Sequence, residues 1–142
     1  MSTKNIIYGL LCAVLSLSAQ ADIIVIAHPE SNIDRLSIRE IANLYLGREP
    51  PRLEGFDIVL LDQPRDSTIR ERFFRMANGM PLRNVNAYWA RLQFSGNKQP
   101  PINLDDSQHV LRAVLSHPKA VGYVDAALAL PEKVRVLAVI RE

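Results

Sequence analysis

The sequence predicts an α/β fold, a three-layer domain in which a mostly parallel sheet is flanked by helices. Short apolar runs rich in β-branched residues, which are typical of buried strands, alternate with longer segments of helical periodicity. Strands and helices that alternate along a chain form a largely parallel sheet with helices on its faces. The composition, 48% hydrophobic and 23% charged, excludes a disordered chain and a polytopic membrane protein.

Residues 1–21 are predicted to be a cleaved export signal. Lys4 precedes an apolar run that extends from Ile6 to Leu17, and small residues follow at Ala19 and Ala21. This order is typical of a secretory signal, and the apolar run is too short for a membrane span. We therefore expect a periplasmic protein without a stable membrane anchor, whose single domain is residues 22–142.

The first half of that domain is predicted to contain one strand and one helix before the second strand. The apolar run 22–27 predicts the first strand, and 57–61 predicts the second. Ser37 and Glu40 have the spacing of a capping box, so a helix is predicted to begin at Ser37. Gly47 is expected to end it, because glycine adopts the left-handed conformation that closes helices.

The second half is predicted to contain three more helices and two more strands. Helices are expected at 68–77, after Pro81 with an apolar stripe over 85–92, and from a cap at residue 105, 106 or 107 to Pro118. The last two strands are predicted at residues 120–124 and 133–140.

The loop 62–68 is a candidate ligand site, since it joins the carboxyl end of a strand to the amino end of a helix. Ligands of α/β sheets bind at such places, and the free N–H groups and positive dipole of a helix start favour an anion. Ser67 and Thr68 offer hydroxyl donors, while Arg65 and Arg70 offer charge-assisted hydrogen bonds.

A purely structural interpretation of this loop remains open. Asp66 or Ser67 would cap the helix whether or not a ligand binds. Asp62 and Asp66 also disfavour an anion unless neighbouring arginines neutralise them.

The segment 65–91 is strongly basic, with six arginines against two acids. It is either a solvated helix surface or a site that attracts an acidic partner. Tyr88 and Trp89 are either core residues or an aromatic platform, and their spacing with apolar neighbours favours the core.

No motif for catalysis, metal binding or a cofactor is found. The three histidines lack the spacing of metal ligands, and neither a nucleophile elbow nor a glycine-rich phosphate loop is present. We therefore expect a protein that is not an enzyme and uses no metal and no cofactor. The net charge of +2 gives no reason to expect nucleic acid as a partner.

Four segments together resemble phosphate-type periplasmic substrate-binding proteins of ABC transporters. They are residues 23–29, the serine-led helix segment 36–47, the strand, loop and helix of 57–74, and Ala-Val-Gly-Tyr-Val at 120–124. The resemblance extends over residues 22–142 and implies one lobe of a type II periplasmic-binding-protein fold. It also implies that the ligand is phosphate or a similar small anion. The residues that we expect to bind it are Ser67, Thr68, Arg65, Arg70 and Ser31.

The loop departs from the corresponding loop of this family, which resembles arginine-x-x-glycine-serine-glycine-threonine. Ser67 keeps the serine, but Gln63 replaces the arginine, Asp66 and Thr68 replace the glycines, and Ile69 replaces the threonine. Because glycine lets the backbone approach a phosphate closely, this loop is expected to be a poorer cradle.

The family clamps its anion between two lobes, whereas residues 22–142 correspond to one. The binding site would then have one open face, or a partner would complete it. The primary hypothesis is a non-enzymatic protein that binds phosphate or a similar anion. The alternative is a periplasmic interaction module that has lost ligand binding and docks on another protein or on a second copy of itself.

Overall fold

The computed structural model describes residues 22–96 and 98–142, so the predicted export signal lies outside the described residues. The strands are β1 (Ile23–Ala27), β2 (Val59–Asp62), β3 (Ile102–Asn103), β4 (Ala120–Asp125) and β5 (Arg135–Ile140). The α-helices are α1 (Ile38–Tyr45), α2 (Thr68–Asn78), α3 (Leu82–Phe94) and α4 (Ser107–Ser116), with a short 3₁₀-helix at Pro51–Leu53. No helix in these two ranges is long and apolar enough to cross a membrane.

The strands form one sheet in the order β3-β2-β4-β1-β5. β2 pairs in parallel with both β3 and β4, whereas β1 pairs antiparallel with both β4 and β5. Four strands therefore point in one direction and β1 points in the other. This arrangement confirms the predicted α/β fold with a mostly parallel sheet.

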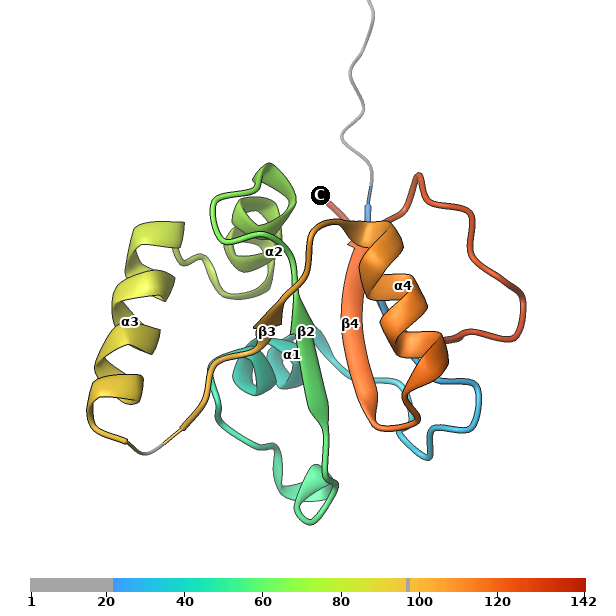
Figure 1. Ribbon diagram of the computed structural model, residues 1–142, viewed down its shortest axis with the longest axis horizontal. Helices are drawn as coiled ribbons and strands as arrows, with labels where there is room; N and C mark the ends of the chain where they lie inside the picture. The colour runs from blue at the N-terminus through green and yellow to red at the C-terminus, as the bar shows by residue number, and fades with distance from the viewer. Residues whose placement is uncertain (1–21, 97) are drawn as a thin grey trace, which may run out of the picture.

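Helices cover both faces of the sheet, as the three-layer prediction requires (Figure 1). One face packs against α1, α2 and α3 around a cluster of aromatic side chains, in which Phe73 stacks on Tyr123 with ring centroids 3.8 Å apart. Tyr45 meets Phe73 edge-on at 4.8 Å. The other face packs against α4 through a smaller aliphatic cluster that includes Val110 and Val114.

The predicted starts of α1, α2 and α4 are confirmed, and their causes are local hydrogen bonds. Ser37 and Glu40 form the capping box, with the Ser37 N–H donating to Oε2 of Glu40 at 2.7 Å. Asp106 caps α4 and Ser67 caps α2. α2 ends one residue later than predicted, at Asn78, because Gly79 takes up the left-handed conformation with φ of 71°.

Two elements were not predicted, and both are very short. β3 has two residues and is bounded by Pro101, and the 3₁₀-helix spans three residues. Hydrophobic periodicity can be recognised only over a longer run of residues than either element contains.

Candidate functional site

The carboxyl end of β2 carries a buried ion pair that links the sheet to α2. Asp62, the last residue of β2, is 1% exposed, and Arg70, in the first turn of α2, is 5% exposed. Nε of Arg70 donates to Oδ2 of Asp62 at 2.8 Å. Oδ1 of Asp62 accepts from the Tyr123 hydroxyl and from the backbone N–H of Gln63.

Two opposing effects act on the pKa of Asp62 in this pair. Burial raises the pKa of Asp62, while the Arg70 charge and the hydrogen bonds to its carboxylate act in the opposite direction. Burial also raises the pKa of Tyr45 and Tyr123 well above the ordinary value, and the charge of Asp62 adds to that rise. Both tyrosines therefore stay neutral, and Tyr123 acts as a hydrogen-bond donor to the carboxylate.

Arg70 is fixed by several hydrogen bonds, yet one of its terminal nitrogens has no acceptor in the part of the chain that the structure describes. Nη1 donates to the backbone oxygen of Arg65 at 2.9 Å and to Oδ1 of Asn86 on α3 at 2.8 Å. The guanidinium carbon also lies 5.2 Å from the ring centroid of Phe74. Nη2 has no acceptor among the described residues and is not sealed from solvent.

Arg70 lines a small hollow between the end of β2 and α3, which we call the arginine hollow. Its lining consists of Asp62, Arg65, Arg70, Asn86, Trp89, Ala90, Gln93, Pro100, Pro101 and Asn103. The volume is about 100 Å³, the share of roughly three water molecules in the liquid. Two arginines against one aspartate give the lining a positive charge, so a small anion suits it in both size and sign.

A second hollow lies on the other side of the α2 start, and we call it the acidic hollow. It is lined by Gln63, Pro64, Ser67, Ile69, Asp105, Asp106, Ser107, Gln108 and Asp125. Three aspartates line it and no basic residue does, so its charge disfavours an anion.

The Ser67 hydroxyl, which faces the acidic hollow, is occupied by the protein itself. It donates to the backbone oxygen of Pro64 at 2.7 Å and accepts from the N–H of Arg70 at 3.3 Å. These two bonds close the turn and cap α2, as the structural interpretation of the loop anticipated.

The structure divides the five residues predicted to bind a ligand into three groups. Arg65 and Arg70 line the arginine hollow, whereas Ser67 faces the acidic hollow and Thr68 is exposed beside it. Ser31 lies at the opposite edge of the sheet, because β1 runs antiparallel to β4 and delivers the loop after it to the amino ends of β2 and β4.

Sequence reasoning missed the amide residues of the arginine hollow, Asn86, Gln93 and Asn103. Asn86 and Gln93 are seven positions apart on α3 and therefore share a face of that helix with Ala90. This periodicity was a usable signal. No comparable signal marked Asn103 in the sequence, because strand β3 was not predicted.

The basic segment is partly neutralised and its aromatic residues are structural. Arg72 lies 3.8 Å from Asp125 and Arg75 lies 2.8 Å from Glu142, measured between nitrogen and carboxylate oxygen. Trp89 is 5% exposed, and its indole N–H donates to the backbone oxygen of Tyr45 at 3.2 Å. The core interpretation of Trp89 is confirmed.

Histidines contribute no metal centre to the part of the chain that the structure describes. Within residues 22–96 and 98–142, no three His, Cys, Asp or Glu side chains are grouped so that they could hold a metal ion.

Comparison with known proteins shows the fold. No family model and no curated protein matches the chain. Among solved structures, it matches a protein of Clostridium perfringens assigned as a phosphate ABC transporter substrate-binding protein and solved with bound phosphate, with 20% identity and a TM-score of 0.62. It also matches an ABC-type phosphate transport receptor from Vibrio cholerae (13%, 0.61) and PstS from Borrelia burgdorferi (16%, 0.55).

Each of these three matches covers 84% of this chain but only 45–47% of the other protein. The chain thus spans less than half the length of these structures. The predicted resemblance is confirmed at the level of the fold, which is that of one part of phosphate ABC transporter substrate-binding proteins. These structural neighbours are transporter binding proteins and not enzymes.

Proposed function

We propose that this chain is a non-enzymatic, periplasmic binding protein that holds phosphate or a similar small anion in the arginine hollow. The observation that carries the proposal is the geometry of Arg70. Its guanidinium is almost fully buried and fixed by three acceptors, Nη2 has no acceptor among the described residues, and Arg65 lines the same hollow. A charged donor fixed in advance loses little side-chain entropy when a ligand arrives.

The charge of the site supports an anion. Asp62 neutralises one of the two arginines, which leaves a net charge of +1 among Asp62, Arg65 and Arg70. Asn86 and Gln93 add neutral amide groups to the same lining.

The place of the hollow in the fold is a second support. It lies beyond the carboxyl ends of β2 and β3, where α/β sheets bind ligands. One structural neighbour was solved with phosphate bound. We also propose that residues 1–21 are an export signal and that residues 22–142 form a single lobe. A second molecule would then cover the open face of the binding site.

Titration calorimetry with phosphate tests the proposal, with Arg65→Gln as the variant. Arg65 is exposed, so its replacement removes a charged donor without disturbing the core. We expect phosphate binding to weaken about tenfold, the value of one charge-assisted hydrogen bond.

Arg83→Gln is the matched control, because Arg83 is an exposed arginine of α3 that does not line the hollow. It should leave the affinity unchanged. Equal weakening in both variants would indicate general electrostatics. Absence of both binding heat and thermal stabilisation at millimolar phosphate would refute the proposal, because a ligand of the folded state must raise the melting temperature.

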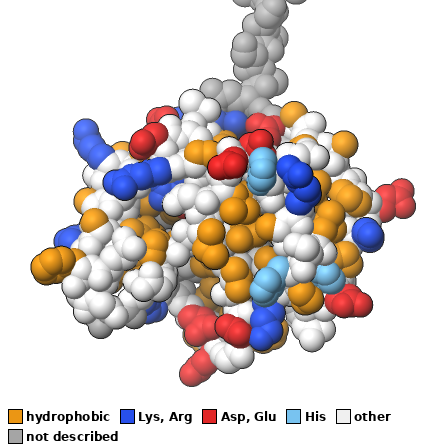
Figure 2. Space-filling view, viewed as in Figure 1, with side chains coloured by type: hydrophobic (Ala, Val, Ile, Leu, Met, Phe, Trp, Pro, Cys, Tyr) orange, Lys and Arg blue, Asp and Glu red, His pale blue; other side chains and the backbone are white. Residues whose placement is uncertain are grey.

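The second candidate function is a protein-interaction module, and an exposed apolar surface favours it. Phe94 at the end of α3 is 97% exposed, and Ile102 on the edge strand β3 is 53% exposed. Figure 2 shows apolar side chains gathered on this side of the molecule, between α3 and α4. Exposed apolar patches are typical of interaction sites.

Sedimentation velocity distinguishes this second candidate from the first. An interaction of the chain with itself should produce a concentration-dependent dimer that Phe94→Ser abolishes. A monomer at all concentrations, together with phosphate binding, would favour the anion-binding function alone.

A further inference from the structure

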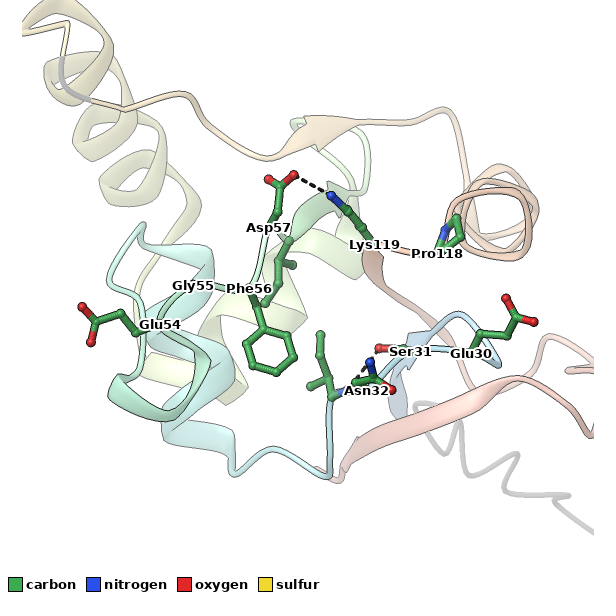
Figure 3. A pocket seen from close by; sticks show the side chains of 11 residues that line it. Glu30, Ser31, Asn32, Glu54, Gly55, Phe56, Asp57, Pro118 and Lys119 are labelled. Atoms are coloured by element: carbon green, nitrogen blue, oxygen red, sulfur yellow. Dashed lines mark hydrogen bonds and ion pairs between the residues drawn. The ribbon is translucent and has the colours of Figure 1, made fainter.

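A cavity of the described residues lies at the amino edge of the sheet, opposite the arginine hollow, and we call it the amino-edge cavity (Figure 3). Its volume is about 490 Å³, within the range of pockets that bind small molecules. The lining consists of residues 30–33 after β1, residues 54–58 before β2, and Pro118 and Lys119 before β4.

Apolar groups form the middle of this cavity. The aromatic side chain of Phe56 is 39% exposed, and its ring lies across the cavity from Ser31 and Asn32, below the Asp57–Lys119 pair (Figure 3). Ile33 and Ile58 line the same space. Ser31, which is 7% exposed, has its hydroxyl fixed by the N–H of Ile33 at 3.2 Å.

The charged groups of the lining are unbalanced. Lys119 donates to Oδ2 of Asp57 at 2.9 Å and thereby lowers the pKa of that carboxyl, so these two charges cancel. Glu30 and Glu54 have no cationic partner among the described residues, and they stand at opposite ends of the cavity with their carboxyl groups turned outward (Figure 3). The cavity therefore combines an aromatic and aliphatic middle with a net charge of −2.

We propose that the amino-edge cavity binds a small organic cation, an ammonium group carried on an apolar body. The hydrocarbon part would pack on Phe56, Ile33 and Ile58, where burial of apolar surface is favourable. The ammonium group would lie at one end of the cavity, in the negative field of Glu30 or of Glu54, and the face of an aromatic ring also attracts cations. This site is separate from the anion site, because the two lie at opposite edges of the sheet.

Three probes of similar size separate the charge from the apolar body, namely 2-phenylethylamine, 2-phenylethanol and phenylacetate. Binding is followed by amide chemical shifts in the full chain. We expect the amine to bind about 3- to 10-fold more tightly than the alcohol, and the carboxylate to bind weakest. The shifts should concentrate at residues 30–33 and 54–58.

Variants assign the preference to the two free carboxylates. Glu30→Gln and Glu54→Gln each replace an exposed side chain, and the variant at the end that holds the ammonium group should reduce the preference for the amine. Glu132→Gln is the matched control, an exposed acid outside the cavity. Equal binding of all three probes, an unchanged preference in both cavity variants, or shifts located elsewhere would overturn the proposal.

Discussion

Replacing Asp62 by asparagine should be one of the most destabilising single substitutions in this protein. The asparagine side chain has the same shape, but its amide nitrogen or neutral oxygen faces the Arg70 guanidinium at the 2.8 Å position of Oδ2. Arg70 is 5% exposed and would keep its charge without a counter-ion. Removal of one partner of a buried pair costs about 3–5 kcal/mol of unfolding free energy.

The assay is equilibrium unfolding by urea, supported by thermal melting. For a domain of this size, 1 kcal/mol corresponds to about 3–5 °C in melting temperature, so Asp62→Asn should melt at least about 10 °C lower. Asp66→Asn is the matched control, since Asp66 is an exposed acid in the same loop. It should change the unfolding free energy by less than about 0.5 kcal/mol.

A double variant tests the stated cause. Asp62→Leu combined with Arg70→Met removes both charges, and apolar replacement of a whole buried pair is often neutral or stabilising. We expect the double variant to be more stable than Asp62→Asn. If Asp62→Asn loses no more stability than Asp66→Asn, the reasoning about the buried pair is refuted.

Two further predictions concern stability. Arg52 and the cap bonds of Ser37 lower the pKa of Glu40 to about 2, so this carboxylate stabilises the fold above pH 4.5 and the contribution disappears as the pH falls toward 2. Wild type should lose about 1 kcal/mol more than Glu40→Gln over that interval, because the pair is near the surface; parallel pH profiles would contradict this. Gly122→Ala should destabilise by about 1–3 kcal/mol, since its Cβ would lie 2.5 Å from Cγ1 of Val110. Val110→Ala should restore part of that loss in the same unfolding assay, and an additive double variant would argue against overpacking.

Helix ends were the most predictable part of the fold. The caps at Ser37 and Ser67 depend on hydrogen bonds between residues three positions apart, so the pattern is complete within a few letters of sequence. The buried strands were predictable for a related reason, since apolar runs such as 120–124 are buried on both faces of the sheet.

The candidate site was only partly predictable. Arg65 and Arg70 belong to one local segment, and their place at the end of β2 follows from the strand–loop–helix order. Nothing local indicated that Arg70 would be buried against Asp62 and tied to Asn86, sixteen positions away. Because this constraint depends on how α3 packs beside α2, it required the folded structure.

The sequence by itself determined the α/β class, the helix caps and the position of the anion-site candidate after β2. Tertiary structure alone decided the direction of β1, and with it the edge at which Ser31 lies. An apolar run is equally suited to either direction, because burial depends on side chains and not on the sense of the backbone. Strand direction therefore follows from long-range pairing, which separates the arginine hollow from the amino-edge cavity.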